Sequence, residues 1–534
     1  MTKDIDVLII GAGINGAGLF RDLAEQGVSS AIVDKGDFGS GTSAAPSRMI
    51  HGGLKYLETG EFGLVAQSTY ERNLLLKNAP HLIKPLETMI PMFSWLKGIP
   101  AALRTLFGSK TAARSRGALL IEVGLFIYDF FGSRARVMPR HSFWTKARAK
   151  RELPLITDRI VAMGSYFDAR VTAPERLVLE LVKDGCAAHS DAIALNYANV
   201  TGQEGGVVTV ESAAGVQSFR PKIVVNAAGP WIDRVNGVLG SESKFIGGTK
   251  GSHVVLDHPQ LREMLNGRMI YFETNEGRIC LAYEYEGRVM LGTSDIRADN
   301  PDEVACQDDE IEYFFDVLRN VFPELPLDRS QIVYAYSGIR PLPASDGLAV
   351  GLISRDHSVP VIAATAERPF DILSLVGGKW TTFRGFAEEV ADDVLGRLER
   401  TRRVSTSELP IGGGRGFSEA VTQTSGRARE LVERYGATGL EIAKVEAEGG
   451  ERITDLASTS RAEIEWICDN ERVVHLADIV IRRTLVAVRG ELTNAALTEI
   501  AQIAARVLGW SADRTQEELS KTHAMLVGKH RMRL

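Results

Sequence analysis

Cysteine is scarce in this sequence, and long apolar runs and an excess of positive charge are absent. The four cysteines are widely scattered with no C-x-x-C pair, which excludes a disulfide framework and a zinc site and favours a reducing, cytoplasmic location. No run of 18 uncharged apolar residues occurs, so no membrane-spanning helix is predicted. Asp4 and Asp6 precede a short apolar run, which argues against a signal peptide. A formal net charge of −6 argues against nucleic acid as a partner.

Length and composition are those of a globular protein with several domains. A chain of 534 residues is long enough for two to four domains with sizeable cores. The sequence is 44% hydrophobic and 24% charged, which separates it from disordered and fibrous chains.

A nucleotide-binding pattern opens the chain and organises the rest. The apolar run VLII before Gly11 predicts a buried parallel strand, and a helical apolar period follows Gly16. Gly11, Gly13 and Gly16 form G-x-G-x-x-G, the turn at which a pyrophosphate approaches the backbone. A second apolar strand ends at Asp34, where a carboxylate would accept the ribose hydroxyls of adenosine. The pattern predicts binding of an ADP moiety and does not by itself decide between FAD and NAD.

Seven further motifs occur along the chain. They are GTSAAPSRMIHGGLKYLE (Gly41–Glu58), GLFIYD (Gly124–Asp129), NAAGPW (Asn226–Trp231), KGSH (Lys250–His253), GTSD (Gly292–Asp295), SGIRPL (Ser337–Leu342) and GGKWTTFR (Gly377–Arg384). These motifs strongly resemble those of the FAD-dependent glycerol-3-phosphate dehydrogenases, within the D-amino-acid-oxidase-like FAD oxidoreductases. The resemblance covers roughly the first 400 residues convincingly and the remainder loosely. It implies FAD as the cofactor.

The resemblance and the pattern of elements predict an α/β protein with three parts. We expect a discontinuous Rossmann-like FAD-binding domain, a β-rich α+β substrate-binding domain and a C-terminal helical domain. The expected boundaries are 1–78, 161–235 and 331–398 for the first, 79–160 and 236–330 for the second, and 399–534 for the third.

The resemblance also implies which residues hold the cofactor. In the family, the segment that follows the second strand passes along the flavin, and small residues after a later strand approach the dinucleotide. The implied cofactor-binding residues are Gly11, Gly13, Asn15, Gly16, Asp34, Thr42, Ser43, Ser47, Ala228, Gly229, Gly378, Lys379, Trp380 and Thr381.

Oxidation of a secondary alcohol requires a base for the hydroxyl proton and a hydride acceptor, which flavin supplies. Gly377–Thr382 precedes a predicted helix, so its N–H groups and Lys379 would stabilise negative charge on the flavin. His51 lies beside two glycines, and its imidazole would act as a base near neutral pH, although a structural role stays open. Arg340 suits two-pronged binding of a phosphate. We expect catalytic roles for His51, Arg340 and Lys379.

Two departures from the family pattern concern the substrate. Lys55 stands where the family usually has Arg, which keeps the charge but loses the planar two-pronged donor. Leu281–Glu284 replaces an apolar-Pro-Trp stretch that is frequent in the family. The expected substrate is sn-glycerol 3-phosphate, and another polyol phosphate such as erythritol phosphate is the alternative. The expected substrate-binding residues are Lys55, Tyr56, Arg278, Asp295 and Arg340. Asp295 would equally suit a turn at the end of a strand.

Residues 88–121 contain no acidic residue, carry several cations and aromatic residues, and run into the apolar segment ALLIEVGLFIYDFF. This composition is typical of a peripheral membrane contact, and also of a partly buried helix pair whose cations extend to solvent. Family members that pass electrons to membrane quinone bind the membrane peripherally. The resemblance therefore implies quinone as the acceptor and a place on the cytoplasmic face of the inner membrane.

Several alternatives stay open at this point. Oxygen would replace quinone if the chain were an oxidase. An amine or amino-acid oxidase of the wider superfamily would leave the phosphate-binding cations without a purpose. A non-catalytic flavin-binding scaffold is disfavoured because His51, Arg340 and Lys379 occur together. The sequence leaves both a monomer and a homodimer open.

Overall fold

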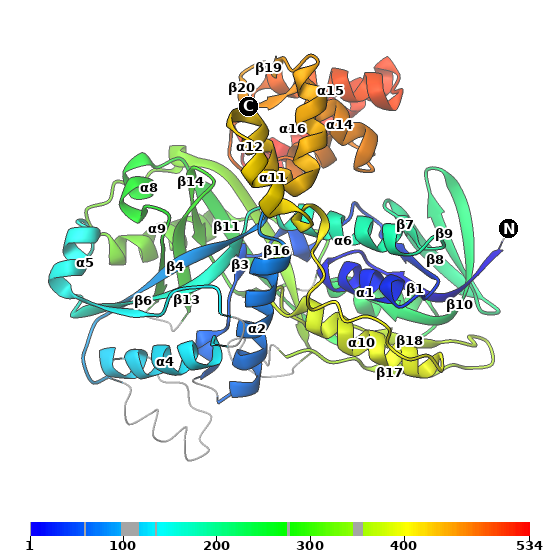
Figure 1. Cartoon of the computed structure of the whole chain (residues 1–534), viewed down its shortest axis with the longest axis horizontal. Helices are drawn as coiled ribbons and strands as arrows, with labels where there is room; N and C mark the ends of the chain where they lie inside the picture. Colours follow the sequence, from blue (N-terminus) through cyan, green and yellow to red (C-terminus); the bar gives the residue numbers. More distant parts are fainter. Residues whose placement is uncertain are drawn as a thin grey trace.

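The computed structural model describes residues 2–57, 60–97, 117–133, 136–274, 278–298, 300–344 and 356–534. Two large sheets lie side by side, and a C-terminal helical region lies across their junction (Figure 1). The expected membrane-contact stretch is described only in part, because residues 98–116 lie outside these ranges.

The first sheet is mostly parallel. Its strands run in the order β17-β18-β10-β1-β2-β7, and every neighbouring pair from β18 to β7 is parallel. The antiparallel strands β8 and β9 extend from β10. The bounds are β1 Thr2–Ile10, β2 Ser30–Val33, β7 Ile193–Leu195, β8 Ala198–Glu204, β9 Val207–Ser212, β10 Gly215–Asn226, β17 Val361–Ile362 and β18 Asp371–Ser374. The sheet confirms the predicted α/β class and its Rossmann-like cofactor layer.

The apolar run of β1 is continuous because both faces of this strand are covered. Val7 and Ile9 pack on one face into a core that includes residues of α1, α6 and α10. Leu8 and Ile10 pack on the other face with residues of β8 and β9. The helices of this layer are α1 Ile14–Glu25, α6 Pro174–Ala188, α7 Ile232–Val238 and α10 Phe383–Arg397.

The second sheet is larger and mostly antiparallel. Its order is β15-β11-β14-β13-β12-β4-β6-β3, with β16 paired to β11 and β5 paired to β6. The bounds are β3 Met49–Ile50, β4 Ile83–Met92, β5 Ser142–Thr145, β6 Ala162–Val171, β11 Ile246–Leu256, β12 Met269–Glu273, β13 Ile279–Tyr285, β14 Arg288–Gly292, β15 Ile296–Arg297 and β16 Ile332–Pro343. The accompanying helices are α2 Phe62–Asn78, α4 Ala118–Phe131, α5 Lys146–Glu152, α8 Pro259–Leu265 and α9 Asp308–Val321.

Three strands differ from the expected division of the chain. Strands β3, β6 and β16 fall in segments assigned to the cofactor domain, yet all three pair within the second sheet. An apolar strand pattern predicts burial but carries no information on which sheet the strand joins. We therefore propose domain boundaries that place β3, β6 and β16 with the substrate-side sheet.

The C-terminal region is predominantly helical, as predicted. It packs through a shared apolar core on the face of the second sheet that carries Val255, Tyr283 and Tyr334. α8 and α9 cover the opposite face. The elements of the C-terminal region are α11 Phe417–Gln423, α12 Gly426–Tyr435, α13 Gly439–Ala447, β19 Arg452–Ile453, β20 Leu456–Ser460, α14 Arg461–Asn470, α15 Asn494–Leu508 and α16 Ala512–Ala524.

Candidate active site

The glycine turn after β1 leaves no room for side chains. Gly11 has a φ of +104°, and a Cβ there would lie 2.6 Å from the carbonyl oxygen of Ala227 and 2.8 Å from Cα of Ala228. A Cβ on Gly16 would lie 2.0 Å from the carbonyl oxygen of Gly11. The first turn of α1 therefore packs directly against the strand ends. This is the geometry by which a helix N-terminus receives a pyrophosphate.

Asp34 lies at the carboxyl end of β2, beside this turn. Its carboxylate accepts hydrogen bonds from the amide of Ala12 at 2.7 Å and from the amide of Gly36 at 2.8 Å. Burial raises the pKa of Asp34 to about 6. The carboxylate is thus fixed next to the place where a ribose would follow the pyrophosphate.

The loop formed by residues 41–56, the flavin loop, connects the two sheets. Thr42 donates from its hydroxyl to the carbonyl of Ile339 on β16 at 2.6 Å. The Ser43 hydroxyl accepts from the amide of Ile14 at the start of α1 at 2.9 Å. One short segment is therefore anchored both to the nucleotide turn and to the second sheet.

A segment distant in sequence closes the other side of the nucleotide turn. Gly377 and Gly378 have φ values of +74° and +89° and precede α10. Asn15, on α1, donates from Nδ2 to the Gly377 carbonyl at 3.4 Å. Trp380 donates from its indole nitrogen to the Ser43 carbonyl at 3.2 Å. The structure thus brings together three of the segments that were predicted to bind the cofactor.

Three of the predicted site residues form a cluster at the end of the flavin loop. Nζ of Lys379 lies 3.6 Å from the ring centroid of Tyr56. The rings of His51 and Tyr56 are 6.2 Å apart between centroids. The Thr381 hydroxyl lies 3.1 Å from both the amide nitrogen and the carbonyl oxygen of His51, which fixes the backbone at this position.

Arg340 lies on β16 on the substrate-side sheet. Its Nη1 pairs with Asp295 at 3.0 Å, and its Nη2 donates to the Thr293 hydroxyl at 2.9 Å and to the Ser294 carbonyl at 3.2 Å. The neighbouring Gly251 is needed here, because a Cβ on it would lie 2.1 Å from Nη2 of Arg340. Asp295 therefore orients the Arg340 guanidinium.

His253 belongs to this site but was not predicted as a site residue. Its Nε2 hydrogen-bonds to the Ser47 hydroxyl at 2.8 Å, and its ring stacks on Tyr336 with centroids 5.0 Å apart. Burial, assisted by the charges of Arg340 and Arg48, lowers the pKa of His253 to about 3, so the ring is neutral at neutral pH. The signal for His253 was its place at the end of the KGSH motif.

The remaining predicted residues are placed as follows. Lys55 lies beside Tyr56 on a short 3-10 helix, Leu54–Leu57. Gly229 has a φ of +57° and follows Ala228, which approaches the nucleotide turn. Arg278 is exposed at the start of β13, with its guanidinium 6.0 Å from the centroid of Tyr313.

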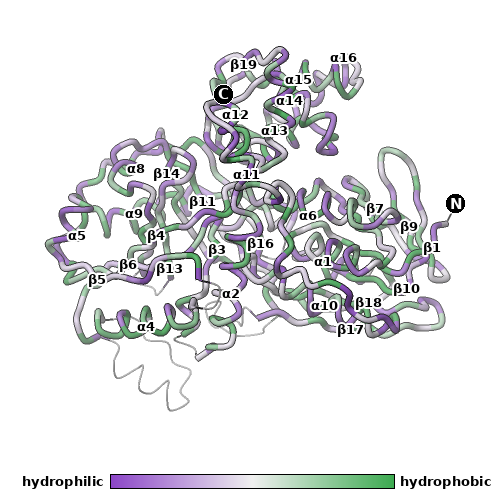
Figure 2. The backbone as a smooth tube through the Cα atoms, in the orientation of Figure 1, coloured by the Kyte–Doolittle hydropathy of each residue, from purple (hydrophilic) through white to green (hydrophobic). Residues whose placement is uncertain are grey.

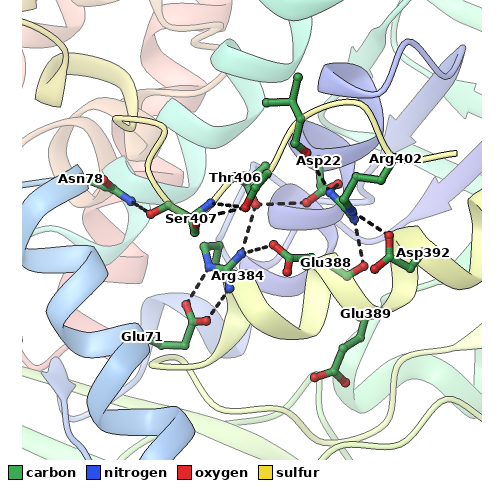
Figure 3. A network of polar contacts seen from close by, with 12 residues as sticks. Asp22, Glu71, Asn78, Arg384, Glu388, Glu389, Asp392, Arg402, Thr406 and Ser407 are labelled. Atoms are coloured by element: carbon green, nitrogen blue, oxygen red, sulfur yellow. Dashed lines mark hydrogen bonds and ion pairs between the residues drawn. The ribbon is translucent and has the colours of Figure 1, made fainter. Parts of the chain in front are cut away.

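Arg384, the last residue of the GGKWTTFR motif, binds acidic side chains of α2 and of its own helix, α10. Its guanidinium binds both carboxylate oxygens of Glu71 on α2, at 2.6 and 2.9 Å, and also Glu388 on its own helix (Figure 3). Thr406 bridges Arg384 to Asp22 of α1. This network fixes α10 to α1 and α2 and so holds the preceding Gly377–Thr382 segment in place.

The residues present fit a flavin dinucleotide. The turn at Gly11–Gly16 excludes side chains and offers a helix N-terminus, and Asp34 supplies a carboxylate beside it. Oδ1 of Asn15 is buried, and among the described residues it has no hydrogen-bond partner, so a ligand donor would satisfy it. FAD would be held by these groups, by Thr42, Ser43 and Ser47 of the flavin loop, and by the Gly377–Thr382 segment.

Comparison with known proteins agrees with this geometry. Residues 6–392 match the model of the family "FAD dependent oxidoreductase", and residues 404–515 match the "C-terminal domain of alpha-glycerophosphate oxidase". The chain is 32% identical to a glycerol-3-phosphate dehydrogenase of Synechocystis over 97% of this chain and 95% of that protein. It is 28% identical to the aerobic glycerol-3-phosphate dehydrogenase of Staphylococcus saprophyticus over 90% of this chain and 87% of that protein.

Among solved structures, the glycerol-3-phosphate dehydrogenase of Bacillus halodurans complexed with FAD has the same fold. Its TM-score is 0.75 at 23% identity, and the match covers 98% of this chain and 95% of that one. The family match covers well over half of the chain, and the relatives match along nearly all of it. The chain therefore belongs to the FAD dependent oxidoreductases.

Proposed function

We propose that this protein oxidises sn-glycerol 3-phosphate to dihydroxyacetone phosphate with FAD as the hydride acceptor. The observation that carries the proposal is the flavin loop. It is bonded to the nucleotide turn at Ile14 and, through the Ile339 carbonyl, to β16, the strand that carries Arg340. The loop itself carries His51 and Tyr56, which lie beside Lys379. A cation anchored for an anionic substrate thus lies near a nucleotide-binding turn, and the relatives named above are glycerol-3-phosphate dehydrogenases.

Arg340 would bind the substrate phosphate. Asp295, Thr293 and Ser294 hold its guanidinium from one side, so the cation is oriented before the substrate arrives. A preoriented guanidinium binds phosphate through charge-assisted, two-pronged hydrogen bonds. Lys55 and Arg278 would add charge at the rim of the same site.

His51 would take the hydroxyl proton, because Thr381 fixes its backbone and its ring faces the Tyr56–Lys379 pair. Lys379 precedes α10, so its ammonium and the helix N-terminus would stabilise negative charge that develops nearby. When bound, FAD supplies the hydride acceptor. The indole of Trp380, bonded to the flavin loop, would help to exclude water.

The test is an anaerobic titration of the FAD-loaded protein, followed by visible absorbance. Bleaching of the oxidised flavin by sn-glycerol 3-phosphate supports the proposal. Bleaching only by erythritol 4-phosphate would support the same chemistry on a different substrate. Lys55→Arg would then be the variant that tests whether this position selects the substrate. Bleaching only by an amino acid, or none at all with FAD bound, overturns the proposed function.

For the electron acceptor we propose a membrane quinone, reached by peripheral binding through helix α4. Figure 2 shows α4 as a largely hydrophobic segment at the edge of the molecule. Its outer face exposes Leu119, Val123, Phe126 and Phe130 by 53%, 50%, 73% and 71%. Trp95 and Leu96, beside the start of α4, are exposed as well. No helix among the described residues is long and apolar enough to cross a membrane.

An apolar helix face of this kind suits a lipid surface, because a helix lying in the interface buries one face in the acyl region. The acid-free composition of residues 88–121 favours an anionic lipid surface in particular. A quinone dissolved in the bilayer would then be close to the substrate-side sheet. Reduction of a soluble quinone analogue by the protein and glycerol 3-phosphate, measured with and without vesicles and compared with oxygen consumption, separates this acceptor from oxygen.

A further inference from the structure

A buried polar cluster lies directly under the flavin loop. The amide of Gly52 donates to the hydroxyl of Tyr128 at 2.9 Å and to Oδ1 of Asp168 at 3.0 Å. The Tyr128 hydroxyl donates in turn to the same Asp168 oxygen at 2.5 Å. Nη1 of Arg72 donates to the Tyr128 hydroxyl and to Oδ1 of Asp168, both at 2.9 Å. The flavin loop, α2, α4 and β6 therefore meet at the Gly52 amide.

The members of this cluster are closely packed and nearly inaccessible to solvent. Arg72, Tyr128 and Asp168 come from α2, α4 and β6, and each is at most 4% exposed. Arg72 and Asp168 form an ion pair, so the cluster holds one cation and one anion. Burial and the Asp168 carboxylate raise the pKa of Tyr128 well above its usual value, so its hydroxyl keeps its proton.

The cluster packs so closely on the loop that no side chain fits at Gly52. A Cβ on Gly52 would lie 2.2 Å from the Tyr128 hydroxyl oxygen and 2.5 Å from Cγ2 of Thr69. A Cβ on Gly53 would lie 2.2 Å from the ring of Tyr56. The backbone between His51 and Tyr56 is thus in contact with the cluster beneath it and with the Tyr56 ring.

A buried ion pair with a bound tyrosine is costly to desolvate and is no strong source of stability in itself. What the cluster does supply is a fixed direction for one backbone amide, because a hydrogen bond to charged groups tolerates little displacement. A displacement of the Gly52 amide would carry His51 and Tyr56 with it. Small displacements of reacting groups cost rate rather than binding.

We propose that Tyr128, Asp168 and Arg72 are positioning residues that set the reactive geometry of the flavin loop through the Gly52 amide. The inference rests on the proposed function, in which His51 and Tyr56 face the substrate. The three residues act through the loop backbone and are not catalytic groups themselves.

The test compares Tyr128→Phe with Tyr166→Phe in the FAD-loaded full-length protein. Tyr166 is a suitable control because its ring packs edge-on against Tyr128, with centroids 5.4 Å apart, and it is equally buried. Each change removes one hydroxyl and leaves the ring in place. The first measurement is hydrogen–deuterium exchange of the peptide that covers residues 49–57, and the second is the limiting rate of flavin bleaching.

For Tyr128→Phe we expect about fivefold faster exchange in this peptide, since one net hydrogen bond is worth about 1 kcal/mol. We also expect an approximately tenfold lower limiting rate, with FAD content and half-saturating substrate concentration unchanged. Tyr166→Phe should stay within about twofold of the original protein in both measurements. An Asp168→Asn variant, where it folds, should show larger effects in the same direction.

Unchanged exchange or an unchanged bleaching rate in Tyr128→Phe overturns the proposal. Equal losses in Tyr166→Phe overturn it as well, because packing would then account for the effect. Exchange needs no substrate. If glycerol 3-phosphate fails to bleach the original protein, the proposed function falls, and the exchange comparison still decides whether the cluster holds the loop.

Discussion

The charged form of the Asp34 carboxylate is disfavoured in the cofactor-free protein. Burial raises its pKa to about 6 in the folded chain, against an unfolded value near 3.8. A raised folded pKa means that the carboxyl stabilises the cofactor-free fold below about pH 4 and loses this contribution as the pH rises through 6. Ribose hydroxyls donate hydrogen bonds to the charged form, so FAD binding should favour loss of the proton.

We therefore predict that FAD affinity rises with pH through this range. At pH 5 a carboxyl with a pKa of about 6 is roughly nine-tenths protonated, so the dissociation constant should be about tenfold higher than at pH 7. Quenching of flavin fluorescence on binding measures it. Asp34→Asn should bind weakly at both pH values, and an equally steep pH dependence in that variant would assign the titration to another group.

Arg340 gives a second prediction at the scale of one side chain. Arg340→Ala removes the proposed phosphate partner and should raise the half-saturating concentration of glycerol 3-phosphate about a hundredfold, with FAD content unchanged. Arg340→Lys keeps the charge, loses the two-pronged geometry and should fall in between, near tenfold. Anaerobic bleaching at a series of substrate concentrations gives these values.

The control for this series is Arg319→Ala on α9, which removes an exposed arginine paired within its own helix. It should leave the half-saturating concentration within about twofold. Equal effects of the alanine and lysine changes at position 340 would show that positive charge alone contributes nothing there and that the two-pronged geometry is required.

From the sequence, candidate site residues could be named, but the contacts between them could not. The glycines and Asp34 follow from a local pattern, because strand, turn and helix are adjacent in the chain. The contacts of Arg340 with Asp295 and of Lys379 with Tyr56 join segments far apart in sequence, and resemblance only implied that they share a site. His253 was not predicted as a site residue although it ends the KGSH motif, because the sequence does not show that its ring is buried and bonded to Ser47.

At the scale of one element, α4 has two contrasting faces. Leu125 and Tyr128 are buried on its inner face, whereas Phe126 and Phe130 are exposed on its outer face. Replacing both phenylalanines by serine should weaken sedimentation with anionic phospholipid vesicles by at least about tenfold. Full burial of one such ring is worth about 1.5–3 kcal/mol, and partial insertion of two is enough for this loss.

Val216→Ser is the matched control for this double change. Val216 is 65% exposed at the β9–β10 turn, on the cofactor sheet and away from α4. It should leave vesicle binding unchanged. Equal sedimentation of the α4 variant and the original protein would contradict the membrane role of this helix.

Strand membership shows the limit of sequence prediction at this scale. The segments that form β6 and β16 were assigned to the cofactor domain, and both are strands. Their sheet was assigned from chain order, yet β6 pairs with β4 and β16 with β11. Pairing depends on which edges are available in three dimensions, and no local pattern encodes this.

At the scale of the whole molecule, one carboxylate joins the cofactor layer to the C-terminal region. Asp37, three residues after Asp34, binds Nη1 of Arg483 at 2.6 Å and Nη2 at 3.0 Å, and Nε of Arg482 at 2.8 Å. Burial alone would raise the pKa of Asp37, but the two arginines hold it well below its usual range. Residues 404–515 match a separate family model. These ion pairs therefore connect this region to the segment that follows Asp34.

A depressed folded pKa contributes stability that is present above the unfolded pKa, near 4, and is lost as the pH falls further. We predict that Asp37→Asn unfolds more easily at pH 7, by about 3 kcal/mol, because two buried arginines lose their charged partner. Its stability should also fall less steeply than that of the original protein between pH 4 and pH 2. Urea unfolding at a series of pH values tests both.

The exposed Asp469→Asn is the control and should follow the original protein at every pH. An Asp37→Asn protein that keeps both its stability at pH 7 and the full acid dependence would show that the ion pairs of Asp37 do not hold the C-terminal region in place.

During synthesis on the ribosome, β1 is made first and its sheet is completed late. Its partner β10 ends at Asn226, and β18, which completes the parallel part of the sheet beyond β10, ends at Ser374. At translation speeds of roughly 5–20 residues per second, the apolar edge of β1 and its neighbours is left incomplete for tens of seconds. Arg482 and Arg483, the partners of Asp37, emerge later still. The nascent chain should therefore depend on chaperones that shield apolar strands.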